Sequence, residues 1–171
     1  MAMAAAPALA QTAPTDVETF KHAAAAVLTY PNYTIFDDVA LDASNGVVRL
    51  EGKVTTPVKR NAIEQRVARV PGVVTVDNQI EVLPVSQFDD QLRYLTARRI
   101  YGSDYFWPYA SMSQPPIHIV VENGRVTLRG VVNSEVERQL ATSLTVSTGA
   151  FSVTNELQTD AEVQAQLDAI S

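Results

Sequence analysis

A short pattern that begins with Asn-Gly occurs twice in this chain and constrains its fold more than any other feature. The first copy spans residues 45–52 and the second spans residues 123–130, 78 positions later. Asn and Gly tolerate the positive φ angles of a type I′ turn, so each copy predicts a tight hairpin. Beyond each turn, apolar residues alternate with polar ones, which is the period of a strand with one buried face. Each strand then reaches a glycine, Gly52 or Gly130, where we expect it to end or bend.

The segments around both hairpins follow one order of helix, strand, strand, helix, strand. Asp16 is a candidate N-cap for the first helix, and Thr56 followed by Pro57 predicts the start of the second. Ser86 with Asp89 and Ser134 with Glu137 have the spacing of capping boxes and predict the two helices of the second repeat. The helical residues that we expect to face the core are Val17, Phe20, Ala24, Val27, Leu28, Val58, Ala62, Ile63, Val67, Val70, Phe88, Leu92, Leu95, Ile100, Val136, Leu140 and Leu144.

The chain is therefore predicted to be an α+β protein with two αββαβ modules, at residues 14–84 and 85–158. Each module should hold a three-stranded mixed sheet with two helices packed on one face. The hairpin strands should be antiparallel, and the helical crossover to the third strand suits a parallel pair. The linker at residues 82–87 is short, so we expect the modules to pack together.

An asparagine interrupts the apolar alternation of each third strand, at Asn78 and at Asn155. A buried amide needs hydrogen-bond partners. We therefore predict that both side chains bond to the backbone at a turn or a strand end, which is a structural role.

The second repeat contains an insertion that is rich in aromatic residues. Tyr30 and Val39 are 9 positions apart, whereas Tyr101 and Ile117 are 16 apart. Arginines beside Tyr, Phe and Trp are typical of an anchor at a membrane interface. Alternatively, the rings fill the gap between the modules or pack beneath the loop. The candidate lipid-binding or partner-binding residues are Arg98, Arg99, Tyr101, Tyr105, Phe106, Trp107 and Tyr109.

The charge and the residue types present exclude several kinds of site. A net charge of −6 argues against nucleic acid as a partner, and the lack of cysteine excludes disulfides, thiolate-bound zinc and a thiol nucleophile. His22 and His118 have no acid at ligand spacing, so we predict no metal site and no cofactor. The second helix carries a basic face that is either solvated or meets lipid phosphates. The residues of this basic face are Lys59, Arg60, Arg66 and Arg69.

Two pairs of acids are the remaining candidates for catalysis. The pair at residues 37–38 precedes a strand, and the pair at residues 89–90 opens a helix, where carboxylates favour the helix dipole. Both positions have a structural explanation, and no phosphate loop or nucleophile motif accompanies them. We therefore predict that the protein is not an enzyme.

Both ends of the chain carry patterns of their own. Residues 1–13 are rich in alanine, and Ala8-Leu9-Ala10 has the small-x-small form of a signal-peptidase site before Gln11. This segment is either the tail of an export signal or a disordered terminus. At the other end, Thr159 and Glu162 form a capping-box pattern, which predicts a helix over residues 159–171 that packs on the second module. The apolar stripe of this helix is Val163, Leu167 and Ile170.

The chain resembles two BON domains in tandem. The matching features are the two Asn-Gly hairpins, the strand glycines, the turns at Pro71-Gly72 and Gly149, and the two strands with a central asparagine. BON modules are small domains of the bacterial envelope, and the matching region covers about residues 16–158. The resemblance implies a periplasmic, non-enzymatic protein that associates with phospholipid and supports envelope integrity or stress tolerance, as osmotically inducible proteins of this family do. An interaction or chaperone-like scaffold in the envelope is the alternative. It would use exposed strand edges or the aromatic insertion.

Overall fold

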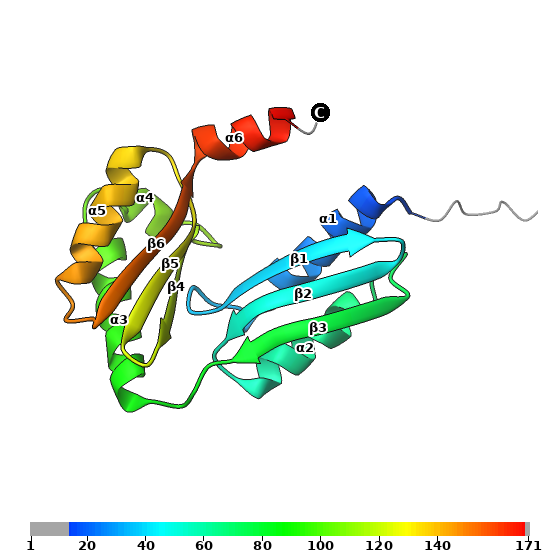
Figure 1. Ribbon diagram of the computed structural model, residues 1–171, viewed down its shortest axis with the longest axis horizontal. Helices are drawn as coiled ribbons and strands as arrows, with labels where there is room; N and C mark the ends of the chain where they lie inside the picture. Colours follow the sequence, from blue (N-terminus) through cyan, green and yellow to red (C-terminus); the bar gives the residue numbers. More distant parts are fainter. Residues whose placement is uncertain (1–13, 170–171) are drawn as a thin grey trace, which may run out of the picture.

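The computed structural model describes residues 14–169 and contains two three-stranded sheets, one in each repeat (Figure 1). We call the first repeat the first module and the second repeat the second module. The elements of the first module are α1 (Asp16–Leu28), β1 (Asp38–Ser44), β2 (Val47–Val54), α2 (Pro57–Val67) and β3 (Thr75–Val82).

The second module has the same order with one added short helix. A final helix, α6, leaves the end of its last strand. The elements are α3 (Gln87–Tyr101), α4 (Trp107–Ala110), β4 (Ile117–Glu122), β5 (Arg125–Val132), α5 (Glu135–Val146), β6 (Ser152–Thr159) and α6 (Asp160–Ala169).

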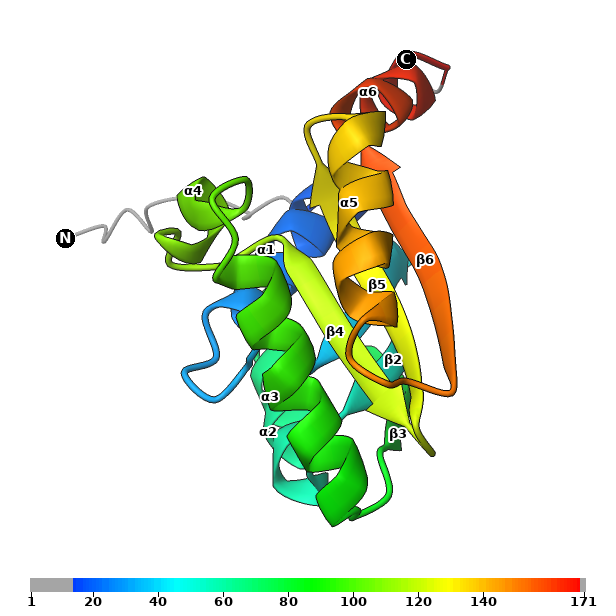
Figure 2. The same cartoon turned by 90° about the vertical axis from the view of Figure 1, so that its left-hand side faces the viewer.

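The sheets confirm the predicted fold. In each sheet the hairpin strands are antiparallel, and the central strand pairs in parallel with the third. Figure 1 shows α1 and α2 behind the first sheet, and Figure 2 shows α3 and α5 on the near face of the second. Both modules are therefore two-layered, with one open sheet face each.

The hairpin turns adopt the predicted left-handed backbone. The φ angles are 51° at Asn45 and 76° at Gly46, and 52° and 75° at Asn123 and Gly124. Such angles strain most residues, whereas Asn and Gly tolerate them. The two Asn-Gly pairs therefore fix where each sheet folds back.

The strand glycines lie inside β2 and β5 and do not end them. Gly52 and Gly130 have φ angles of 127° and 120°, which L side chains rarely adopt. A Cβ at these positions would lie 2.1 Å from the carbonyl oxygen of Asp38 and 1.8 Å from that of Pro116. Only glycine allows the neighbouring strand to begin so close.

Four apolar residues predicted to face the core are instead exposed. Each is the second residue of its helix, namely Val17, Val58, Phe88 and Val136. In α2 and α5 the buried positions are the seventh and eleventh residues, such as Ile63 and Val67. Five positions turn an α-helix by roughly 140° beyond one full turn, so the second residue points away from the sheet.

The prediction was also wrong for Phe20, Leu28 and Leu95, which are partly exposed. Small or polar residues occupy several of the sheet-facing positions instead. They let the helices lie close to the sheet, and they are Thr19 and Ala23 in α1, Thr96 in α3, and Ala141 and Thr145 in α5.

The helix caps differ from the prediction in their partners. Thr15, not Asp16, caps α1 and forms a reciprocal capping box with Glu18. Ser86 and Ser134 accept the expected N–H groups, but the carboxylates of Asp89 and Glu137 bind elsewhere. The hydroxyl side of each capping box therefore forms, while the carboxylate serves another contact.

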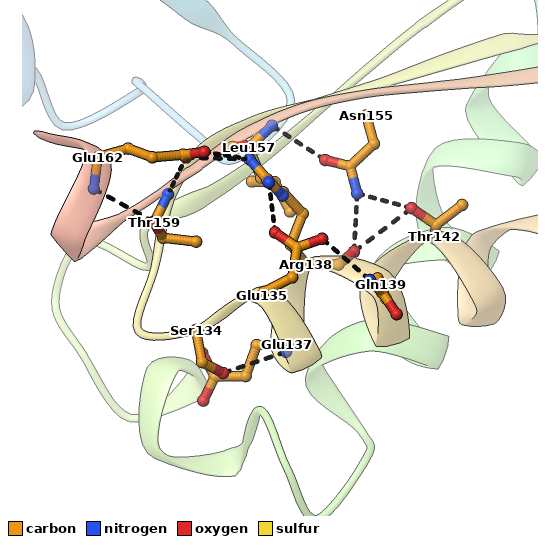
Figure 3. Close-up of polar contacts among 10 residues, drawn as sticks. All are labelled: Ser134, Glu135, Glu137, Arg138, Gln139, Thr142, Asn155, Leu157, Thr159 and Glu162. Carbon is orange, nitrogen blue, oxygen red and sulfur yellow. Dashed lines mark hydrogen bonds and ion pairs between the residues drawn. The ribbon is translucent and has the colours of Figure 1, made fainter.

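The C-terminal helix α6 does not pack on the second module as predicted, because none of its described residues is buried. It begins at the reciprocal capping box of Thr159 and Glu162 and projects from the end of β6 (Figure 1). Arg138 of α5 donates to Glu162 at 2.9 Å and joins it to the module (Figure 3). Leu167 is half exposed, and Ile170 lies outside the described residues.

The two modules pack against each other, in agreement with the short linker. Ile35 and Phe36, from the loop before β1, contact the core of the second module. The N–H of Ile119 in β4 donates to the carbonyl oxygen of Ile35 at 2.6 Å. The Phe36 ring meets Tyr94 of α3 edge-on, with 5.3 Å between their centroids.

Candidate functional site

The insertion, residues 102–116, is closed at its base by the side chain of Tyr101. The hydroxyl of Tyr101 donates to the carbonyl oxygen of Ile117 at 2.6 Å and accepts from the N–H of Ile117 at 3.1 Å. One side chain thus ties the end of α3 to the start of β4. Burial raises the pKa of Tyr101, so its hydroxyl stays protonated and keeps both bonds.

Two further rings of the insertion point into the core. Phe106 is 0% exposed and stacks on Tyr109, with 5.9 Å between the ring centroids. The Tyr109 hydroxyl donates to Glu137 of α5 at 2.7 Å and accepts from the N–H of Asn133 at 3.0 Å. Burial, followed by the hydrogen bond to Glu137, raises the pKa of Tyr109 to about 12. Phe106 and Tyr109 therefore pack beneath the insertion, as in the alternative interpretation of the aromatic cluster, and they are not part of an exposed surface.

The remaining rings of the insertion face solvent. Tyr105 is 66% exposed and Trp107 is 69% exposed, on either side of the buried Phe106. Arg98 and Arg99 lie exposed in the last turn of α3, immediately before the insertion, and form no ion pair with any described residue. We call these four residues the aromatic–arginine surface.

The predicted basic face of α2 is only partly a free surface. Lys59 reaches the buried carboxylate of Asp37 at 2.6 Å. Arg66 donates to the carbonyl oxygen of Ala26, and its guanidinium lies 5.8 Å from the centre of the Tyr30 ring. The side chains of Lys59 and Arg66 thus make contacts within the first module.

Both acid pairs have structural partners. Asp37 is fully buried and accepts from the backbone and hydroxyl groups of Thr34 and Thr55. Asp89 is also buried and accepts from the N–H groups of Asn123 and Gly124. The two buried carboxylates face different partners in different modules, so they do not converge on one point.

The histidines lie apart from each other and from any set of ligands. His22 is exposed on α1, while His118 is partly buried and contacts the carbonyl oxygen of Asp37 through Nδ1. Within residues 14–169, no group of three or more His, Cys, Asp or Glu side chains could hold a metal ion. No helix in this part of the chain is both long and apolar enough to cross a membrane.

A polar cleft of about 680 Å³, which was not predicted from the sequence, is bordered by the strands of both modules. Lys53 of β2 pairs with Glu122 of β4, and Arg129 of β5 pairs with Asp38 of β1 at 3.1 Å. In β2 the charged residues alternate with buried ones such as Leu50, so they lie on the other face of the sheet. This alternation could have indicated a charged face, but it could not have shown that the second module lies against that face. The carboxylates that these cations contact on their own sheets are Glu81 and Glu156.

These features define a tandem α+β repeat protein whose buried aspartates have partners within their own modules and whose insertion exposes two aromatic rings. The sequence profile of the BON domain matches residues 30–84 and 108–161, which together make up more than half of the chain. The chain belongs to the BON domain family and contains two such domains. No similar sequence is found among curated proteins.

Two solved structures show a distant likeness to this chain. One belongs to structural studies of CdsD, a structural protein of the type III secretion system of Chlamydia trachomatis. It is 14% identical with a TM-score of 0.32, over 86% of this chain and 96% of that one. The C-terminal domain of CdsD is 13% identical with a TM-score of 0.33, over 91% of this chain and 71% of that one. Likenesses at these scores say nothing about function.

Proposed function

We propose that this protein binds phospholipid membranes peripherally through the aromatic–arginine surface. The main support for the proposal is that the side chains of residues 105–107 alternate between exposed and buried. Phe106 is buried and fixes the insertion, while Tyr105 and Trp107 are held outward. The exposed rings lie in a segment whose two ends are held together, because Tyr101 at the end of α3 is hydrogen-bonded to the first residue of β4.

The surface combines the two interactions that hold proteins at a bilayer interface. Trp and Tyr rings favour the head-group region, where one edge is apolar and the other is wet. Each arginine near an anionic bilayer contributes about 1 kcal/mol. Since the whole chain has a net charge of −6, attraction to an anionic surface must come from a local cluster such as Arg98 and Arg99.

Co-sedimentation with vesicles of phosphatidylglycerol and phosphatidylcholine tests the aromatic part. We expect the double variant Tyr105→Ala, Trp107→Ala to bind at least about tenfold more weakly, which corresponds to about 1.4 kcal/mol. The matched control is Phe151→Ala, because Phe151 is 76% exposed and lies outside the insertion. Equal binding by the double variant and the control would reject the proposed surface.

A charge-matched comparison tests the arginines. The pair Arg98→Gln, Arg99→Gln should lose about 2 kcal/mol, or roughly thirtyfold in partitioning at low salt. The control pair Arg60→Gln, Arg69→Gln changes the net charge equally from exposed positions of the first module. If both pairs weaken binding to the same extent, only the net charge matters and the local cluster does not.

We further propose that the protein works in the periplasm, in envelope integrity or stress tolerance, and carries out no reaction. The Ala8-Leu9-Ala10 triplet supports export, although residues 1–13 lie outside the described region. Asp37 and Asp89 are buried and hydrogen-bonded within their own modules, which supports a binding role. N-terminal sequencing of the protein from a fractionated bacterial host tests the location. A periplasmic chain that begins at Gln11 is expected, and a cytoplasmic chain with residues 1–10 intact would refute it.

A polypeptide partner is the second candidate, favoured by one specific feature. Phe88 and Phe151 stack at 5.5 Å near the Asn123-Gly124 turn, and both are exposed. The end of the second module that carries the hairpin turn thus exposes two stacked aromatic rings, at the opposite end of α3 from the insertion (Figure 2). Recovery of a stoichiometric envelope protein that is lost with Phe88→Ser, together with no vesicle binding, would favour this function.

A further inference from the structure

A second pocket lies where the two modules meet and is separate from the aromatic–arginine surface. Its volume is about 360 Å³. It is bordered by residues 28–31 and 33–35 of the first module, by residues 113–115 at the end of the insertion, and by His118 of β4. This volume falls within the range of small-ligand sites, about 300–1,000 Å³, and such sites often occur between domains.

The lining of this pocket has no Asp, Glu, Lys or Arg, in contrast to the highly charged cleft between the sheets. An ionic ligand would therefore find no counter-charge in the lining, and burying an unpaired charge is costly. The rings of Tyr30, Tyr33 and His118 form much of the wall, and the last two lie 5.7 Å apart with a tilt of 45°. Aromatic walls favour a ligand that is itself a planar ring.

Two of these rings each retain one hydrogen-bonding function. The Tyr33 oxygen accepts from the N–H of Val39 at 3.1 Å, which leaves its own hydrogen to donate. Burial raises the pKa of Tyr33, so that hydrogen is retained. His118 contacts the carbonyl oxygen of Asp37 through Nδ1, and a carbonyl can only accept. Nδ1 therefore carries a hydrogen, and in the neutral form of the ring Nε2 is the acceptor.

The insertion is joined to the first module beside this pocket by the side chain of Gln114. Gln114 Nε2 donates to the carbonyl oxygen of Leu28 at 2.6 Å. Leu28 is the last residue of α1, where a carbonyl group has no partner within the helix. Both modules and the insertion thus contribute to one pocket.

We infer that this pocket binds an uncharged small molecule that combines a planar ring with one hydrogen-bonding group. The inference rests on a two-module pocket of ligand size, a ring-lined wall without Asp, Glu, Lys or Arg, and the remaining polar atoms of Tyr33 and His118. It does not depend on lipid binding, because none of the residues of the aromatic–arginine surface borders the pocket.

Nuclear magnetic resonance of the full isotope-labelled chain tests this inference, with indole as the probe. Indole should shift the resonances of Tyr33, Gln114 and His118 and saturate with a dissociation constant on the order of 1 mM. Benzoate and benzylamine, the anionic and cationic comparisons, should leave these resonances in place at the same concentrations.

A substitution that fills the pocket with a large side chain, compared with the same substitution elsewhere, provides a second test. Ser113 is exposed at the rim, so Ser113→Trp should weaken indole binding by about tenfold or more. Ser143→Trp, on the exposed side of α5, should leave it unchanged. The inference is overturned if indole fails to shift the pocket resonances of the unmodified chain, or if benzoate or benzylamine shifts them equally. Shifts that persist in Ser113→Trp would overturn it as well.

Discussion

The carboxylate of Asp89, in the first turn of α3, accepts a hydrogen bond from the backbone N–H of Asn123 at 2.9 Å. It also accepts from the N–H of Gly124 at 2.7 Å, so one buried side chain holds both residues of the turn. In the first module, Asp16 of α1 accepts from the N–H of Asn45 at 2.9 Å. An aspartate at the start of the first helix therefore fixes the hairpin turn in both modules.

Replacing Asp89 with Ala should lower the free energy of unfolding by about 3 kcal/mol. Two amides lose their acceptor, and an unsatisfied buried group costs about 1–3 kcal/mol. Asp16→Ala should cost about 1 kcal/mol, because Asp16 is exposed and water can replace it. Urea unfolding followed by circular dichroism measures both. Equal losses for the two variants would contradict the proposed role of burial.

Replacing Lys59 with Met should lower the free energy of unfolding by about 3–5 kcal/mol, because it leaves the buried Asp37 carboxylate without its counter-charge. The adjacent Arg60 is exposed, so Arg60→Met should change stability by no more than about 0.5 kcal/mol. Denaturant titration of both variants provides the comparison. A Lys59 variant as stable as the Arg60 variant would show that the ion pair is dispensable.

The sequence was sufficient for the strands and turns because their determinants are local. Asn45-Gly46 and the alternation after it predict both the hairpin and its buried face. It was insufficient for the helix faces. Val58 is apolar and near Ile63 in sequence, but its position in the helix turns it away from the sheet. Which apolar residue is buried depends on where the helix begins relative to the sheet, and residue type alone does not determine that.

The candidate site was predictable only in outline. The cluster of aromatic residues marked the insertion, yet Tyr105, Phe106 and Trp107 are all aromatic, and their aromatic character alone does not show which ring is buried. What separates them is contact with residues distant in sequence, such as Glu137, which orients Tyr109 beside Phe106. The inward and outward rings are therefore decided by tertiary contacts.

Strongly alkaline solution should unfold the protein through its buried tyrosines. Burial raises the pKa values of Tyr33, Tyr101 and Tyr109, the last to about 12, above the ordinary value near 10. A folded pKa above the unfolded one means that the stability is fully present below about pH 10 and is lost as the pH rises through the folded pKa values. The loss for Tyr109 should therefore fall between about pH 10 and pH 12.

Ultraviolet absorbance of tyrosinate during a pH titration measures this effect alongside circular dichroism. Three of the six tyrosines should ionise late and together with unfolding. Tyr109→Phe should remove one late ionisation. Ionisation of all six near pH 10 in a chain that keeps its folded spectrum would contradict the prediction.

Asn78 and Asn155 bond to the backbone as predicted, but they do so in the middle of the edge strands β3 and β6 and not at a turn or a strand end. Asn155 Oδ1 accepts from the N–H of Leu157 at 2.9 Å, and Arg138 donates to the carbonyl oxygen of the same residue at 3.2 Å (Figure 3). Asn78 likewise accepts from the N–H of Ile80 at 3.1 Å. An edge strand with free N–H and C=O groups can pair with another chain. These side chains occupy such groups from within the module.

Asn155→Ala should therefore weaken the fold and expose the edge of β6 at the same time. Loss of the bond to Leu157, and of the bond from Asn155 Nδ2 to Arg138 O at 2.7 Å, should cost about 1–2 kcal/mol. The freed N–H should also promote association that grows with protein concentration, measured by sedimentation velocity. Gln158→Ala, at an exposed position of the same strand, controls for the loss of an amide side chain. If the Asn155 variant stays monomeric and as stable as the Gln158 variant, the asparagine does not protect the edge.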